Sequence, residues 1–527
     1  MATPKGFAKA IIVITTVTAA VMELIDTSIV NVALTDMSGS LGVNIEDISW
    51  VITSYAIANV IIIPLTSFLA EYFGRKNYYI VSMIIFTAAS YMCAQSTTLV
   101  EIIIWRFVQG VGGGALLSTS QAILFDAFEP KDRPIASGLF GMGLVLGPTL
   151  GPTLGGYLID HASWPLIFMI NIPIGIAATL LSFYFIEKKP DEGKNKHKIS
   201  IDYTGIILLM AGIGCLQYVL ERGESDDWFS SESIRICSVI AVVGLIAFII
   251  YELNIEQPAV NLKVLGNRNL AFTTIFTFVA GFGLFTSVFV YPVLAQRVLG
   301  FTAYETGVSL LPPTMAAVVM MPIIGKTMSK GVTPIPFVVT GFLLFALYAY
   351  LSASVSPEVG KWSFFLPLVI RAVGISMCQL PLINQAVAGL QPKDYASGIS
   401  LNNMIRQLGG AFGIAMANNY IAQRYAQHRS DLVSLIPNGS AQLGERVNAL
   451  SQGIISKTGD VANATTKAYA LVNGSVDRQA YFLSYLDTFR LIGIFFLLVI
   501  PLVTFLRVKK KSATEQAAAM KAAAEAH

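Results

Sequence analysis

Long apolar stretches separated by short polar segments follow one another from residue 9 to residue 507. A helix needs about 20 apolar residues to cross the ~30 Å hydrocarbon core of a bilayer. Only helices and closed barrels satisfy their backbone hydrogen bonds in that environment. The stretches have the length of helices and predict fourteen spans: 9–34, 47–70, 78–96, 99–124, 134–158, 165–186, 203–221, 233–252, 270–294, 304–328, 334–354, 363–388, 396–421 and 487–507.

The composition also favours an all-α polytopic membrane protein. Of the 527 residues, 54% are hydrophobic and only 13% are charged, whereas soluble proteins carry about 25% charged residues. The net charge of +3 is small, and no basic stripe with interleaved aromatics indicates nucleic acid binding. The four cysteines and four histidines are scattered, so we expect no disulfide framework, no metal site and no cofactor.

Lysine and arginine gather in alternate connections between the predicted spans. One set of connections includes the cations at 75–76, 131–133 and 188–198, whereas the segments 35–46 and 159–164 contain none. Because cytoplasmic loops carry the excess of Lys and Arg, we expect both termini in the cytoplasm and the protein in the inner (cell) membrane.

A short repeat divides the chain. Residues 130–138 (PKDRPIASG) precede the fifth span, and residues 392–398 (PKDYASG) precede the thirteenth, on the same side of the membrane. Equal orientation predicts two parallel six-span halves with two extra spans between them, a known transporter design. The predicted divisions are 1–186 for the first half, 187–262 for the extra spans and linkers, 263–507 for the second half and 508–527 for a cytoplasmic tail.

The segment 422–486 is the one long polar connection within the second half. By the count of spans it lies outside the cytoplasm, and we expect short amphipathic helices there, lying at the outer surface.

Charged residues inside spans are costly and therefore candidates for function. Glu23 and Asp26 lie three residues apart on the first span, hence on one helix face. Carboxyl groups held side by side away from water can load and release protons near neutral pH. Arg106 on the fourth span lies at a comparable depth, and we expect it to pair with Asp26 or Glu23. The alternatives are, for the acids, a carboxylate that reaches water at a helix end and, for Arg106, a fixed structural ion pair with backbone carbonyls.

Polar residues within the spans are candidates for lining a central substrate cavity, with a structural role as the alternative. They are Glu23, Asn31, Gln109, Asn402, Asn403 and Arg406.

Two further motifs concern movement of the helices. Glu71, Gly74 and Arg75 follow the second span and predict a conformational latch, with ordinary cytoplasmic cations as the alternative. On the fifth span small residues recur at every fourth position and predict a flexible packing seam between the halves. This motif consists of Gly147, Pro148, Gly151, Pro152, Gly155 and Gly156.

Five segments together resemble the major facilitator superfamily, specifically its fourteen-span drug:proton antiporters of the EmrB/QacA-like type. These segments are 24–34, 67–76, 106–112, 147–156 and 164–175. The segment 106–112 is similar to the signature tied to proton coupling, and 147–156 is similar to the antiporter signature. Ser67, Glu71 and Pro165 depart from the usual Gly, Asp and Arg.

The resemblance implies a major facilitator fold that exports amphipathic, often cationic or lipophilic, compounds by alternating access, driven by proton entry. It also implies a link to multidrug efflux and antibiotic resistance. Gram-negative relatives work with a periplasmic adaptor and an outer-membrane channel, so both are expected as candidate partners, with 422–486 as the contact segment.

Two rival interpretations concern function. The same scaffold could serve a narrow-specificity exporter of one metabolite, lipid or siderophore. The second rival interpretation is a membrane-embedded enzyme or sensor. The sequence, however, has no phosphate-binding glycine loop and no His/Glu metal pairing. We therefore expect a transporter and not an enzyme.

Overall fold

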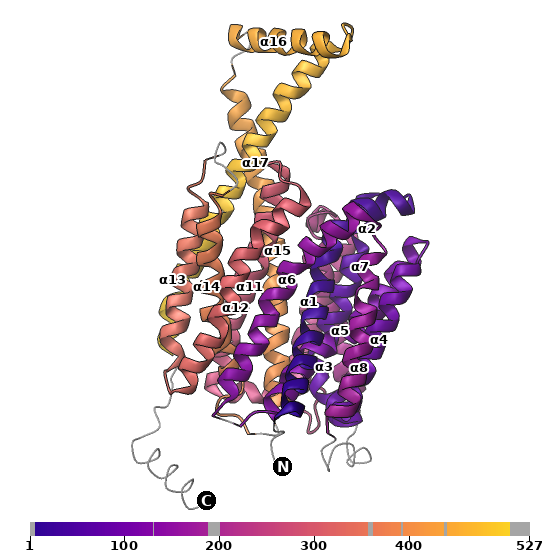
Figure 1. Cartoon of the computed structure of the whole chain (residues 1–527), viewed down its shortest axis with the longest axis vertical. Coiled ribbons are helices and arrows are strands. Elements are labelled where there is room, and N and C mark those ends of the chain that lie inside the picture. Colours follow the sequence, from indigo (N-terminus) through magenta and orange to yellow (C-terminus); the bar gives the residue numbers. More distant parts are fainter. Residues whose placement is uncertain are drawn as a thin grey trace, which may run out of the picture.

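The computed structural model describes residues 6–129, 131–187, 201–356, 362–391, 394–436 and 440–505. Within these ranges every regular element is a helix, and the long helices stand side by side in one bundle (Figure 1). Thirteen helices in the described residues are long and apolar enough to cross a membrane. A further long helix, α15 (Tyr395–Ser434), runs through the bundle with them and makes the fourteenth. The all-α, polytopic fold expected from the sequence is confirmed.

The other membrane helices have the following bounds, with α7 and α8 together forming one span: α1 (Phe7–Leu41), α3 (Trp50–Phe73), α4 (Arg75–Gln95), α5 (Leu99–Asp126), α6 (Arg133–His161), α7 (Leu166–Met169), α8 (Asn171–Phe185), α9 (Tyr203–Arg222), α10 (Glu232–Asn254), α11 (Arg268–Arg297), α12 (Ala303–Ser329), α13 (Pro334–Ser352), α14 (Phe365–Gln385) and α17 (Ala464–Val499). Shorter elements connect or extend them: α2 (Ile45–Ile48), η1 (Trp228–Ser230), η2 (Leu262–Gly266), α16 (Ala441–Thr458) and η4 (Ile500–Phe505). We call the end where α1 begins and η4 ends the terminal end, and the opposite end the hairpin end.

The helix α15 carries more polar residues than the other spans because its polar side chains face protein. Asn402, Asn403 and Arg406 are each at most 3% exposed. Buried among neighbouring helices, these groups avoid the cost of contact with lipid. A long helix with a polar stripe therefore runs through the middle of the bundle.

The segment 422–486 differs from the prediction. The helices α15 and α17 continue past the bundle as a projecting antiparallel pair, and α16 lies across its tip (Figure 1). Ion pairs join the two projecting helices, with Arg429 Nε 2.7 Å from Asp477 Oδ1 and Arg424 Nη2 2.5 Å from Asp487 Oδ2. The expectation of short helices lying at the surface was wrong for most of this segment. The helices α15 and α17 extend beyond the bundle because ion pairs between their polar side chains stabilise the projecting pair.

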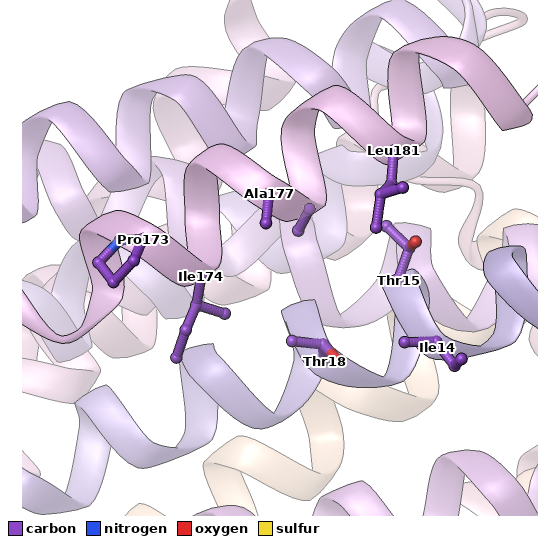
Figure 2. A pocket seen from close by; sticks show the side chains of 8 residues that line it. Ile14, Thr15, Thr18, Pro173, Ile174, Ala177 and Leu181 are labelled. Carbon is purple, nitrogen blue, oxygen red and sulfur yellow. The ribbon is translucent and has the colours of Figure 1, made fainter.

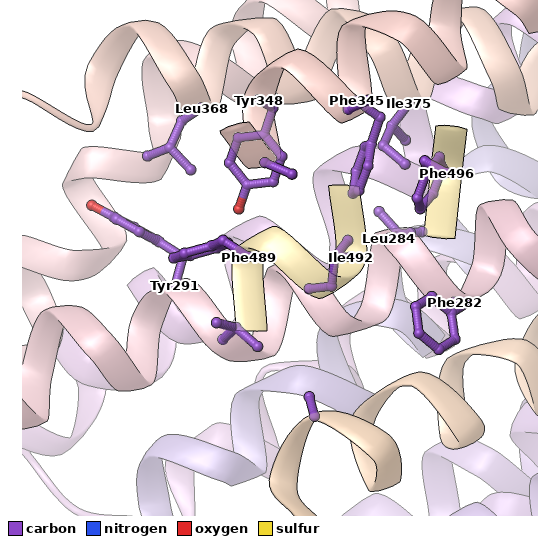
Figure 3. Packing of buried hydrophobic residues seen from close by; sticks show 14 of the residues in the cluster. Phe282, Leu284, Tyr291, Phe345, Tyr348, Leu368, Ile375, Phe489, Ile492 and Phe496 are labelled. Carbon is purple, nitrogen blue, oxygen red and sulfur yellow. The ribbon is translucent and has the colours of Figure 1, made fainter. Parts of the chain in front are cut away.

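Some clusters of buried apolar side chains lie within one half of the chain, and others join side chains of both halves. In the C-terminal half, aromatic rings from α11, α13 and α17 pack together (Figure 3), and the rings of Phe345 and Phe496 stack at 4.1 Å. A second cluster, around Ile29 and Phe168, involves only N-terminal helices. The helix α9 packs against α3 and α15, and α10 packs against α9. The division at 186 and 263 stays a prediction, and residues 188–200 and the tail 508–527 lie outside the described residues.

The two halves meet at the terminal end through the two copies of the sequence repeat. The Arg133 guanidinium lies 4.7 Å from the centre of the Tyr395 ring, and Ser137 Oγ donates to Asn384 Oδ1 at 2.8 Å. Arg133 and Ser137 belong to the first copy and Tyr395 to the second. The helices α6 and α15 both begin at this end and run in the same direction, as a parallel repeat requires.

The glycine ridge of α6 packs within the N-terminal half. Gly147, Gly151 and Gly155 face α1, and a Cβ atom on Gly151 would lie 3.0 Å from the carbonyl oxygen of Ile25. Small residues at these positions let the two helices approach closely. The expectation that this ridge forms the seam between the halves was therefore wrong.

The seam between the halves uses another face of α6. A Cβ atom on Gly138 would lie 2.9 Å from the Met321 carbonyl oxygen of α12. Pro148, Pro152 and Gly156 lie within α6, which continues as one helix through both prolines. The same helix thus packs on α1 with one face and on the opposite half with another.

Candidate functional site

A buried polar site lies where α1, α3 and α5 face the C-terminal half. Glu23 is 1% exposed and Asp26 is 0% exposed, although both are acidic. Arg106 on α5 is 1% exposed. The close packing of α1 on α6 keeps this stretch of α1 away from lipid. Because buried charges need partners, the contacts of these three side chains show what the site can do.

Asp26 has donors on both of its carboxylate oxygens. Arg106 Nη1 lies 2.5 Å from Oδ2, while Gln109 Nε2 and Asn171 Nδ2 donate to Oδ1 at 2.8 and 2.9 Å. Ser90 Oγ accepts hydrogen bonds from the same two amides at 2.6 and 3.1 Å. Both carboxylate oxygens of Asp26 are therefore partnered within one hydrogen-bond network.

Arg106 is fixed by more than its carboxylate. Its Nε donates to the Val51 carbonyl oxygen at 3.1 Å, and its Nη1 also donates to Gln109 Oε1 at 2.8 Å. The guanidinium carbon lies 4.1 Å from the centre of the Tyr55 ring, a distance typical of a cation–π contact. The structure thus combines the predicted partnership with Asp26 and the backbone contact of the alternative interpretation.

Only one of the two carboxylate oxygens of Glu23 has hydrogen-bond partners among the described residues. Its Oε1 accepts from Asn59 Nδ2 at 2.9 Å and from Tyr55 OH at 3.4 Å. Its Oε2 is buried without a hydrogen-bond partner in the described part of the chain. A buried carboxylate oxygen that lacks a donor favours binding of a proton or of a cationic group. Of the two buried acids on α1, Glu23 is the one with a position open for exchange.

Arg406 faces this site from the C-terminal half. It lies close enough to Glu23 for Coulomb attraction, and its Nη2 donates to Asn403 Oδ1 at 3.4 Å. Its Nε and Nη1 atoms have no partner among the described residues. Asn403 Nδ2 in turn lies 3.1 Å from Ser118 Oγ and 3.2 Å from Gln121 Oε1, both on α5. The helix α15 therefore brings a cation and an amide to the acidic site.

The remaining cavity candidates lie apart from this site or serve packing. Asn402 Oδ1 accepts a 2.8 Å hydrogen bond from Thr277 Oγ1 inside the C-terminal half. Asn31 is exposed, and its amide lies 3.4 Å from the Ser28 carbonyl oxygen. The structure thus brings together Glu23, Asp26, Arg106, Gln109, Asn403 and Arg406, and leaves Asn31 outside the buried group.

The candidate latch residues lie at the terminal end, away from the buried acids. Gly74 has φ +85° and connects α3 to α4, a conformation that glycine adopts without strain. Arg75 forms an ion pair with Asp126 at the end of α5. Glu71 is exposed on α3. The latch role remains a prediction, with Asp126 as the observed partner of Arg75.

The sequence pattern did not indicate Tyr55, Asn59 or Ser90, and it assigned no role to Asn171, which lies in the segment 164–175. Tyr55 contacts both Glu23 and Arg106, so it links the two buried networks. An asparagine in the apolar run 56–63 was the available signal for Asn59. The serine and the tyrosine carry no comparable signal, since both are common in membrane helices.

A separate apolar groove lies between α1 and α8 (Figure 2). It has a volume of about 390 Å³ and is lined by side chains such as Thr15, Thr18 and Leu181. Ile14 on its rim is 59% exposed, so the groove opens on the bilayer-facing surface. The Thr15 hydroxyl donates to the Ile11 carbonyl oxygen at 2.8 Å, and the groove therefore offers little polar recognition. No group of three or more His, Cys, Asp and Glu in the described ranges could hold a metal ion.

Comparison with known proteins identifies one family and several relatives. The Major Facilitator Superfamily model matches residues 16–414. The chain is 30% identical over 485 residues to the multidrug export protein EmrB of Haemophilus influenzae, covering 92% of this chain and 93% of that protein. It is 31% identical to EmrB of Escherichia coli over 92% of both chains. It is also 30% identical to the fatty acid resistance protein FarB of Neisseria gonorrhoeae, over 95% and 96% of the two chains.

Two solved structures share the fold. The human organic anion transporter MFSD10 aligns with a TM-score of 0.56 at 13% identity, over 93% of this chain and 99% of that one. A bacterial homologue of the human lysosomal transporter Spinster, in an inward-facing conformation, aligns with a TM-score of 0.53 at 13% identity, over 96% and 100% of the two chains. At this identity the likeness concerns the fold alone.

Proposed function

The chain belongs to the major facilitator superfamily, and on that premise we propose that this multi-pass membrane transporter exports amphipathic or lipophilic compounds in exchange for protons. The observation that carries the proposal is Glu23, a carboxylate that is 1% exposed and has one oxygen without a partner among the described residues. An antiporter needs one site where proton and substrate exclude each other, and this oxygen meets that need.

In the proposed cycle a proton and the cationic group of a substrate compete for Glu23. Either one neutralises a carboxylate that is expensive to keep ionised away from water. Movement of the two halves then exposes the loaded site to the other side of the membrane, as in other parallel-repeat transporters. Proton entry down its gradient thus drives substrate out.

The Asp26–Arg106 pair supports this exchange and is the second candidate for proton coupling. Tyr55 contacts both groups, because its ring lies under the Arg106 guanidinium at 4.1 Å and its hydroxyl lies 3.4 Å from Glu23. Loss of charge on Glu23 would change the hydrogen bond of Tyr55 and hence the position of Arg106. We therefore assign proton exchange to Glu23 first and to Asp26 with Arg106 second.

The relatives support efflux as the direction of transport. Two of them are named multidrug export proteins, and each matches over nine-tenths of the chain. FarB, at a comparable identity, is named for resistance to fatty acids. This second name favours the alternative of a narrow exporter for one class of lipid-like compound on the same scaffold.

We place the terminal end in the cytoplasm and the hairpin end outside the inner membrane. Arg75, Lys131 and Lys326 lie at the terminal end or in its connections, as expected for cytoplasmic loops. The projecting part of α15 and α17 with α16 then extends into the periplasm (Figure 1). It is the surface we assign to a periplasmic adaptor and, through it, an outer-membrane channel.

The test is transport in proteoliposomes with an imposed pH gradient. We expect wild-type protein to accumulate a fluorescent lipophilic cation against its gradient. Glu23→Gln should lose uphill transport and bind the cation more weakly, because the carboxylate for which proton and substrate compete is gone. Asp36→Asn is the matched control, because Asp36 is exposed on the same helix.

Uphill transport by Glu23→Gln equal to that of wild type would contradict the assignment of the exchange site. A mixed panel of lipophilic cations and fatty acids separates the two substrate hypotheses. Movement of several chemical classes supports multidrug export, whereas movement of fatty acids alone supports the narrow exporter.

A further inference from the structure

Two opposite charges face each other across the boundary between the halves. Glu23 belongs to α1 and Arg406 to α15, and they are 1% and 3% exposed. Glu23 Oε2 has no hydrogen-bond partner in the described residues, nor do Arg406 Nε and Nη1. Buried polar atoms normally have partners. Unpartnered polar atoms on both sides of the boundary therefore indicate that a ligand binds here or that this contact changes when the halves move.

Arg406 has an unusual environment for a buried cation. Its side-chain hydrogen-bond partner among the described residues is the neutral amide of Asn403 at 3.4 Å, and Glu23 is the acid that attracts it. Asp26, the other acid nearby, is already neutralised by Arg106 at 2.5 Å. Arg406 is thus a countercharge for Glu23, although no ion pair within the described part of the chain fixes it.

The surroundings of Glu23 offer few other charged groups. Asp26 follows it by less than a turn on the same helix face, Tyr55 contacts it from α3, and Arg106 lies beyond Tyr55 on α5. Because Arg106 is paired with Asp26, the cation that compensates the charge of Glu23 is Arg406, which belongs to the opposite half. The charge state of Glu23 therefore acts directly on the attraction between the halves.

We propose that Arg406 is a tethered countercharge to Glu23, which a proton or the cationic group of a substrate must replace before the halves separate at the terminal end. The inference rests on the proposed function and narrows its substrate class to amphipathic cations. An amphipathic cation seated on Glu23 also repels Arg406, and this repulsion assists separation.

The arrangement explains why the empty carrier would not cycle. With Glu23 ionised and unloaded, the attraction of Arg406 adds to the contacts of Asn403 with α5 and of Tyr395 with Arg133. The backbone of Arg406 packs against Gly281 of α11, so α15 and α11 move together. The empty carrier stays closed at the terminal end until a proton or a substrate arrives, and exchange is obligatory.

The experiment compares two fluxes in proteoliposomes loaded with a fluorescent lipophilic cation. Net efflux into substrate-free alkaline buffer requires return of the empty carrier, whereas exchange with external substrate does not. We expect Arg406→Gln to raise the rate of net efflux at least tenfold over wild type. A pH-sensitive dye inside the vesicles should report no matching entry of protons. The rate of exchange should stay within twofold of the wild-type rate. Arg406→Lys keeps the charge and is expected to restore low net efflux.

The control variant is Arg490→Gln, whose side chain is 62% exposed on α17, and it should behave as wild type. Unchanged net efflux in Arg406→Gln with intact exchange would overturn the proposal. Loss of exchange in that variant would also overturn it, because Arg406 would then be required for movement of the loaded carrier. Failure of the proposed function would give a different result. Net efflux by the wild-type protein would be fast at every pH, and Glu23→Gln would show the same rate.

Discussion

Replacing Asp26 by Asn tests whether the buried ion pair holds the N-terminal half together. Asn has nearly the shape of Asp, so packing is preserved while the charge is removed. Its Oδ1 atom can still accept hydrogen bonds from Gln109 and Asn171, which lie 2.8 and 2.9 Å from the present oxygen. The amide group, however, would face Arg106 Nη1, a donor that now lies 2.5 Å from Oδ2.

The expected loss of stability follows from the burial of both groups. Arg106 is 1% exposed, so it cannot turn to water when its carboxylate is removed. Removing one partner of a buried ion pair costs about 3–5 kcal/mol, because the other charge remains buried. Backbone contact with Val51 and the ring of Tyr55 retain part of the stabilisation of Arg106, which places the expected loss near the lower value.

The assay is thermal and denaturant unfolding in detergent of wild type, Asp26→Asn, Arg106→Gln and the double variant. We expect both single variants to be destabilised and the double variant to lose less than their sum, with a coupling energy of roughly 2–3 kcal/mol. Asp36→Asn is the control for removal of an exposed acid on the same helix. Additive losses, or wild-type stability of Asp26→Asn, would refute the role assigned to the pair.

Two other predictions concern packing and the projection. Gly151→Leu is expected to lower stability by about 1–3 kcal/mol, because even a Cβ atom would lie 3.0 Å from the Ile25 carbonyl oxygen. Gly444→Leu, at an open position on α16, should have little effect in the same unfolding assay. Asp487→Asn removes the carboxylate that Arg424 contacts at 2.5 Å, so hydrogen–deuterium exchange should speed up in the projecting parts of α15 and α17. Equal exchange rates in Asp487→Asn and in the exposed control Asp431→Asn would show that the ion pair does not hold the projection.

The fold was predictable because the bilayer imposes a length on each helix. Apolar runs of span length gave thirteen helices directly, and α15 was found in spite of its buried Asn402, Asn403 and Arg406. The projection was not predictable from the same pattern. Beyond the bilayer a helix no longer needs apolar residues, so the polar composition of 422–486 could not show that α15 and α17 continue.

The pairing of Asp26 with Arg106 was foreseeable, since opposite charges at similar depth in neighbouring spans must neutralise each other. The position of Asn31 outside the buried group was not foreseeable. It lies five residues after Asp26, which turns it by about 140° around the helix, and it faces away from the buried group. Asn59 was missed for the converse reason, because a polar residue in an apolar run does not reveal which face of its helix is buried. The rotation of each helix comes from packing, as in the contact of α6 glycines with α1.

The most direct test of the central claim is substrate-evoked proton release from the purified protein in weakly buffered detergent solution. Adding a lipophilic cation to wild-type protein near the midpoint of the proton-binding curve is expected to release protons in proportion to the substrate bound. Glu23→Gln should bind substrate more weakly and release none. Proton release from Glu23→Gln equal to that of wild type would show that proton and substrate do not meet at this carboxylate.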